Sequence, residues 1–154
     1  MSKRVAGGTP VRDTKLYYGH QFVDQADVKA VEEVLTSDYL TCGPKVEALE
    51  QKLCALTGAA YAVACSNGTA ALHIAAMAAG VGAGVTTPIT FAASANCALY
   101  CGARPVFADI NPNTYNIDPK SVQKVLSEKT KAVVAVDFTG QAAPLDELLA
   151  LCHE

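Results

Sequence analysis

Apolar residues in the first third of the chain recur every three or four positions, which is the period of a helix with one apolar face. We expect a first helix at about 24–37, where Asp24 is a good N-cap. A second helix should begin at Pro44, a residue suited to a first helical position, and end at Gly58. The first helix carries one apolar stripe, made of Val28, Val31, Val34 and Leu35. The second has an inward-facing apolar set, made of Val46, Leu49, Leu53 and Leu56.

From residue 60 onward, short apolar runs alternate with segments rich in helix formers. This alternation implies crossover connections and a parallel sheet covered by helices on both faces, so the expected fold class is α/β. The expected strands are 60–65, about 85–89, 104–109 and 132–138, and the expected helices are about 69–79, 91–101, 119–128 and 144–153.

Polar residues follow several of these strands. Ser66–Thr69, Thr90–Phe91 and Asp137–Gln141 each come directly after an expected strand. Ligands of open parallel sheets gather beyond the carboxyl ends of the strands. We therefore expect a binding site at that edge, although Asp137 and Gln141 would serve equally well as turn residues.

The segment Cys65–His73 is typical of a tight polar turn between a strand and a helix. We expect the amides near Thr69 to have no backbone acceptor, because the first amides of a helix lack one. They lie at the positive end of the helix dipole, where a phosphate would also meet the hydroxyl of Ser66 or Thr69. The alternative is that Ser66 or Asn67 only caps the helix.

Five motifs follow one another along the chain: residues 40–47, 66–73 (Ser-Asn-Gly-Thr-Ala-Ala-Leu-His), 87–96, 102–109 and 140–141. In this order they resemble the DegT/DnrJ family of pyridoxal-phosphate-dependent sugar-nucleotide aminotransferases. Within it, the resemblance is strongest to the UDP-4-amino-4,6-dideoxy-N-acetyl-beta-L-altrosamine transaminases of pseudaminic acid synthesis. The resemblance implies the N-terminal part of the large domain of a fold-type I transferase. Residues 1–23 would be an arm over the active site and 24–154 a partial large domain, with the small domain absent.

The resemblance also implies a function and a set of site residues. The complete protein would transfer an amino group, from a donor such as glutamate, to a nucleotide-linked 4-keto sugar, at the interface of a homodimer. Phe91 would stack on the ring of pyridoxal 5'-phosphate; alternatively, it packs as the first core residue of its helix. Tyr18 would contact substrate or be a loosely packed aromatic, and His73 is expected to be structural. Cofactor binding is implied for Asn67, Gly68, Thr69 and Phe91, and substrate binding for Tyr18, Asp38, Tyr39, Leu40, Thr41 and Ser66.

Two features depart from the family pattern. The Schiff-base lysine and the carboxylate that binds the pyridinium nitrogen come later in the family than Glu154, so we expect no catalytic residue in this chain and no activity from it alone. About three residues are also missing before Val85, or about 10 Å of strand. We therefore expect the strand at 85–89 to have five residues or fewer and to be shorter than the strand at 104–109.

Composition limits the alternatives. The net charge is −3 and no basic stripe is present, which argues against nucleic-acid or anionic-membrane partners. No apolar run approaches the roughly 20 residues of a membrane span, so we expect a soluble, cytoplasmic protein. The six cysteines lack Cys-x-x-Cys spacing and are expected to be reduced thiols, with no metal site. Two alternatives to an aminotransferase are a non-catalytic remnant and a nucleotide-binding module. The second is disfavoured because its glycine-rich fingerprint should follow a strand, whereas the glycine-rich segment 80–84 follows a helix.

Overall fold

The computed structural model describes Arg12 and residues 14–153, and it divides into two compact units, 1–52 and 53–154. Residues 1–11 and 13, which belong to the expected N-terminal arm, lie outside the described residues, as does Glu154. Each unit is described by itself. Helix α2 (Pro44–Thr57) begins in the first unit and ends in the second.

The first unit contains α1 (Gln25–Leu35), which begins as expected. Asp24 is its N-cap: Oδ1 accepts hydrogen bonds from the amides of Ala26 (2.8 Å) and Asp27 (3.1 Å). The Asp27 carboxylate accepts a bond from the Asp24 amide at 2.9 Å, which completes a capping box. The starts at Asp24 and Pro44 are therefore confirmed, and Gly58, with φ +75°, ends α2 as predicted.

The apolar faces of α1 and α2 remain exposed. Neither helix has a buried residue, and Val46 and Leu56 on α2 are 40% and 83% exposed. The prediction of an inward-facing set on α2 is therefore wrong for the described structure. The spacing predicts which side chains share a face, but burial also needs a second element against that face.

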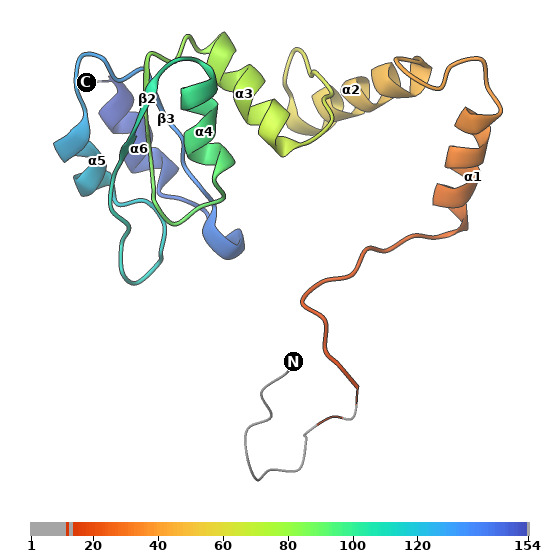
Figure 1. Ribbon diagram of the computed structural model, residues 1–154, viewed down its shortest axis with the longest axis horizontal. Helices are drawn as coiled ribbons and strands as arrows, with labels where there is room; N and C mark the ends of the chain where they lie inside the picture. The colour runs from red at the N-terminus through yellow and green to blue at the C-terminus, as the bar shows by residue number, and fades with distance from the viewer. Residues whose placement is uncertain (1–11, 13, 154) are drawn as a thin grey trace. The chain divides into compact units, whose positions relative to one another are not determined.

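The second unit is built on a parallel sheet of three strands in the order β2-β1-β3 (Figure 1). β1 (Ala83–Thr86) is central, between β2 (Arg104–Phe107) and β3 (Ala132–Val133). Val85 of β1 lies opposite both Val106 and Val133. The predicted α/β class and parallel sheet are confirmed.

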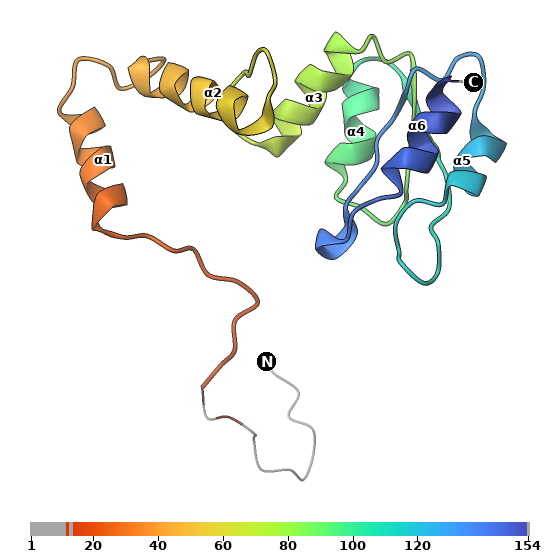
Figure 2. The same cartoon turned by 180° about the vertical axis from the view of Figure 1, so that it is seen from behind.

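Helices cover both faces of this sheet (Figures 1 and 2). α3 (Gly68–Ala78) and α4 (Ala93–Tyr100) lie on one face, and α5 (Pro119–Val125) and α6 (Leu145–His153) lie on the other. Successive strand residues point to opposite faces, so β1 serves both layers. The first core cluster comprises Ala76, Val81, Cys97, Ala98 and Ala103, and the second Val85, Ala108, Ile117, Val122 and Leu148.

The strand predicted at 60–65 is wrong. The segment contains no strand, and Tyr61 and Val63 are 89% and 71% exposed. A strand requires a neighbouring strand for its N–H and C=O groups. No described strand lies beside this segment, because the sheet has only β2, β1 and β3.

The other strands are shorter than predicted. β1 has four residues, which confirms the expected limit of five, but it begins at Ala83 and ends at Thr86 instead of spanning 85–89. β2 also has four residues, so β1 is not the shorter of the two. β3 covers only Ala132–Val133 of the predicted 132–138. Helix α5 ends at Val125, before the predicted 128, because Leu126 adopts an extended backbone with ψ 145°.

Ile117 is fully buried beneath α5 and α6, and it offers a direct test of this core. We expect Ile117→Val to lower the free energy of unfolding by about 1 kcal/mol, because it removes one buried methyl group from a packed site. Urea denaturation of the purified chain measures the change. Ile74→Val deletes the same group from a side chain that is 44% exposed and should cost much less. Equal losses at both positions would contradict the described core.

Candidate functional site

The turn before α3 has the geometry of an anion-binding helix start. Asn67 is the N-cap, with an extended backbone, and its Oδ1 accepts a hydrogen bond from the Ala70 amide at 2.9 Å. The Asn67 carbonyl accepts the Ala71 amide at 3.1 Å. Among the described residues, no acceptor is found for the backbone amides of Gly68 and Thr69. The predicted helix start with unpaired amides is confirmed, although the segment before it is not a strand.

The surroundings of these two amides are open. A Cβ built on Gly68 would meet nothing within 4 Å, so a ligand can approach the backbone there. The Ser66 hydroxyl oxygen accepts a bond from the Asn67 side-chain amide at 3.1 Å, which leaves its own proton for another acceptor. Two unpaired backbone donors and the hydroxyls of Ser66 and Thr69 therefore follow one another along this turn, and a donor set of this kind suits a phosphate group. Asn67 itself acts as the cap, so its side chain serves the helix.

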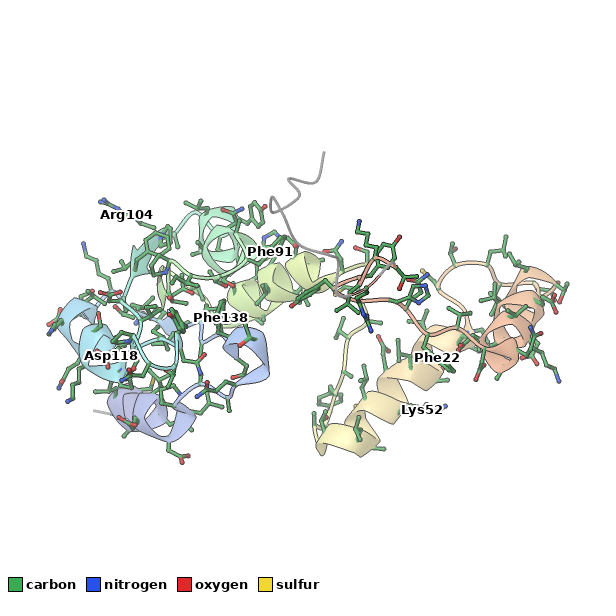
Figure 3. All side chains as sticks on the ribbon, turned by 90° about the horizontal axis from the view of Figure 1, so that it is seen from below. Phe22, Lys52, Phe91, Arg104, Asp118 and Phe138 are labelled. Atoms are coloured by element: carbon green, nitrogen blue, oxygen red, sulfur yellow. The ribbon has the colours of Figure 1, made fainter. Side chains whose placement is uncertain are left out.

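Phe91 lies between the end of β1 and the start of α4 (Figure 3). Its side chain is 75% exposed, so it does not pack as a core residue of that helix. The Phe91 carbonyl accepts a bond from the Ser94 amide at 3.0 Å, and the hydroxyls of Thr90 and Ser94 lie 2.7 Å apart. These bonds order the segment while one aromatic ring remains free to stack on a planar ligand.

The segment after β3 contains the single-turn helix η1 (Phe138–Gly140). Asp137 before it is a turn residue, because its Oδ1 accepts a bond from the Ala143 amide at 2.8 Å. The Gln141 side chain is exposed. Thr139 has a left-handed backbone, with φ 54°, which a β-branched residue rarely adopts.

Asn116 is a residue of this region that the sequence did not indicate. It is buried, at 2% exposure, and all its side-chain hydrogen bonds go to the backbone of 138–142. Its partners are 22 to 26 residues away along the chain, so no local pattern could have identified it.

Three of the predicted site segments lie at one end of the sheet in the second unit. Segment 87–92 and η1 follow β1 and β3, and α3 begins toward the same end (Figures 1 and 2). Figure 3 shows Phe91 and Phe138 on this side. This is the carboxyl end of the strands, where parallel sheets bind ligands.

The other candidate residues belong to the first unit. Tyr39 and Leu40 line a hollow of about 160 Å³ in the loop between α1 and α2. A Cβ on Gly43 would lie only 2.7 Å from the Tyr39 Cβ, so this packing requires glycine. Asp38 and Thr41 are exposed in the same loop, and Tyr18 is fully exposed.

Four further features of the described part of the chain concern metal binding, the cysteines, His73 and the membrane. No group of three or more His, Cys, Asp or Glu side chains there could hold a metal ion. All six cysteines are free thiols. His73 contacts Tyr100, with ring centroids 5.1 Å apart, and is half-buried. None of the described helices is both long and apolar enough to cross a membrane.

The structure is that of an α/β protein with a parallel sheet and a capped helix start whose first amides have no acceptor among the described residues. The sequence profile of the DegT/DnrJ/EryC1/StrS aminotransferase family matches residues 21–154. The chain therefore belongs to this family of sugar aminotransferases, and its fold matches part of a fold-type I aminotransferase.

Relatives agree with this assignment. The chain is 42% identical over 145 residues to the spore coat polysaccharide biosynthesis protein SpsC of Bacillus subtilis, covering 92% of this chain and 37% of SpsC. It is 38% identical over 146 residues to the UDP-2-acetamido-2-deoxy-3-oxo-D-glucuronate aminotransferase of Pseudomonas aeruginosa, covering 87% of this chain and 41% of that protein. Among solved structures, the PseC aminotransferase of Helicobacter pylori, involved in pseudaminic acid biosynthesis, superposes with a TM-score of 0.82 at 35% identity, covering 91% and 39%. The chain thus spans about two fifths of these relatives' length.

The cap of α3 can be tested without a ligand. We expect Asn67→Ala to lower the free energy of unfolding by about 1 kcal/mol, because the Ala70 amide loses its acceptor. Asn67→Asp should keep most of the stability, since a carboxylate oxygen caps a helix equally well. Urea denaturation, with hydrogen exchange at the Ala70 amide, measures both variants. If Asn67→Ala leaves that exchange rate unchanged, the cap does not order this turn.

Proposed function

We propose that the whole protein is a pyridoxal-phosphate-dependent aminotransferase that converts a nucleotide-linked 4-keto sugar to an amino sugar. The observation that carries this proposal is the start of α3 in a chain of a sugar-aminotransferase family. There the amides of Gly68 and Thr69 have no acceptor among the described residues, and a Cβ on Gly68 would meet nothing within 4 Å. That family uses pyridoxal phosphate.

The residues of this chain would hold the cofactor. The amides of Gly68 and Thr69, with the hydroxyls of Ser66 and Thr69, would bind its phosphate, and Asn67 would support them by capping α3. Phe91 would stack on its ring, since its side chain is exposed at the end of β1. When bound, the cofactor supplies an electron sink for the carbon that exchanges its amino group.

The substrate side of the proposal rests on the family. Two relatives bear names that refer to a UDP-linked 3-oxo sugar acid and to pseudaminic acid biosynthesis. For this protein we propose a UDP-linked 4-keto amino sugar as acceptor and glutamate as donor. Tyr18 and Ser66, together with the loop residues Asp38, Tyr39, Leu40 and Thr41, would contact the sugar nucleotide. The site would lie at a homodimer interface, and the protein would act in the cytoplasm.

The chemistry also needs groups that no described residue is placed to provide. Transamination requires a lysine amine to move protons and a carboxylate against the pyridinium nitrogen. We propose that both come from the part of the family's length that these 154 residues do not span. The chain by itself would then bind cofactor weakly and catalyse nothing. A non-catalytic remnant would not bind it, and a dinucleotide-binding module would prefer a dinucleotide.

Binding at the α3 turn can be measured with pyridoxamine 5'-phosphate, whose amine cannot condense with stray lysines. In an amide NMR titration, we expect the Gly68 and Thr69 signals to shift and saturate, because their unpaired N–H groups would donate to the phosphate. Pyridoxamine without phosphate should leave them in place. We expect Gly68→Ala to weaken binding about tenfold, or about 1.4 kcal/mol, because its Cβ would occupy the open space.

The matched control is Gly82→Ala, which also adds a methyl group where nothing lies within 4 Å and should leave affinity unchanged. Phosphate-independent binding, or equal affinity in both variants, would contradict the assigned turn. Tighter binding of a dinucleotide would favour the nucleotide-binding alternative.

Activity is expected only from a completed chain. We expect the 154 residues alone to transfer no amino group from glutamate to a UDP-linked keto sugar, because no lysine is held at the reacting centre. Extension with the downstream coding sequence, or with the C-terminal part of SpsC, should give single-turnover transfer. Borohydride reduction with pyridoxal phosphate should then label one lysine in full yield. Turnover and stoichiometric labelling in the unextended chain would overturn this expectation, and comparing 4-keto with 3-keto sugars would identify the substrate.

A further inference from the structure

Every hydrogen bond of the Asn116 side chain goes to the backbone of one segment, residues 138–142. Nδ2 donates to the carbonyls of Gln141 (3.1 Å) and Ala142 (2.9 Å), and Oδ1 accepts from the Phe138 amide (3.0 Å). The residue is 2% exposed, so water does not compete for these bonds. Both donors of the amide bind the end of segment 138–142, at Gln141 and Ala142, and its oxygen binds the start, at Phe138.

Segment 138–142 has few other contacts with the rest of the protein. Thr139, Gly140, Gln141 and Ala142 are exposed, and Thr139 carries the left-handed backbone described above. Within the turn, the amides of Gly140 and Gln141 donate to the carbonyls of Asp137 and Phe138, each at 3.1 Å, and the Phe138 amide also donates to the Val136 carbonyl at 3.0 Å. Beyond these local bonds, the rings of Phe138 and Tyr115 lie with centroids 6.2 Å apart, and Asp137 bonds the Ala143 amide. A segment with so few buried contacts opens easily unless outside groups hold it.

Asn116, in contrast, is itself firmly anchored. The Asn116 carbonyl accepts a bond from the Asn111 amide at 2.9 Å. The next residue, Ile117, is fully buried and forms a bridge with Ile110, and Asp118 then caps α5. The well-packed residue therefore fixes the weakly packed segment.

The position of the segment gives this contact a functional meaning. Segment 138–142 follows β3 at the carboxyl end of the sheet, the end at which Phe91 and the start of α3 also lie (Figures 1 and 3). The Asp137 carboxylate already accepts a bond from the Ala143 amide, whereas the exposed Gln141 side chain makes no hydrogen bond to a described residue. We propose that Asn116 is a positioning residue, which holds segment 138–142 as one wall of the ligand site; this rests on the proposed function.

Hydrogen exchange can separate positioning from general stability. In Asn116→Ala, we expect faster exchange at the Phe138, Gly140 and Gln141 amides and unchanged exchange at Val85 in the core. Asn116→Asp has nearly the same shape, keeps the acceptor for Phe138 and loses the two donated bonds, so it should loosen the segment even if the alanine variant folds poorly. Asn113 is an exposed asparagine in the same loop, and Asn113→Ala is the control. It should change neither the exchange rates in segment 138–142 nor the exchange rate at Val85.

Affinity for pyridoxamine 5'-phosphate is the second measurement, on the same 154-residue chain. If segment 138–142 is ordered in only about a tenth of the molecules, binding should weaken about tenfold in both Asn116 variants, because only molecules with the ordered segment bind. Equal affinity in all variants would overturn the positioning role while leaving the proposed function standing. Failure of the unmodified chain to bind would overturn both. Uniformly faster exchange, in the core as well as the segment, would show that Asn116 only stabilises the fold.

Discussion

The second unit depends on the central position of β1. Its backbone pairs with a strand on each side, and its side chains must serve two helical layers at once. Val85 packs toward α5 and α6 and is fully buried, whereas Gly84 faces α4, where an added Cβ would lie 3.6 Å from the Ala98 Cβ. The Thr86 hydroxyl donates to the Val134 carbonyl at 3.0 Å, which ties β1 to the chain just after β3. Because the three strands are parallel and short, the segments that follow them emerge at one end.

That end combines two kinds of polar group with different tasks. The side chains of Asn116, Asp137 and Asn67 bind backbone groups and fix the shape of the loops. The backbone amides of Gly68 and Thr69 have no acceptor among the described residues. The division follows from helix geometry, since a cap satisfies some of the first amides of a helix and leaves the others for an outside acceptor. Shape and the proposed binding would thus be provided by different atoms.

Apolar surface is distributed unevenly between the two units. Two clusters of side chains are buried around the sheet, while α1 and α2 bury none, and Tyr61 and Val63 in the segment before α3 are exposed. Sets of exposed apolar side chains of this kind are typical of surfaces that other elements cover. The chain spans about two fifths of its curated relatives' length.

The sequence by itself determined the elements whose causes are local. Asp24 and Pro44 predicted the helix starts, Gly58 predicted a helix end, and alternation of apolar runs with helices predicted a parallel sheet, because capping groups and periodicity act within a few residues. The turn at Ser66–Thr69 was predicted for the same reason. Tertiary structure alone decided which predicted strands have partners, as the failure of 60–65 shows, and which apolar stripes are covered. It also decided the role of Asn116, since a hydrogen bond to a carbonyl more than 20 residues away exists only once the sheet brings the two loops together.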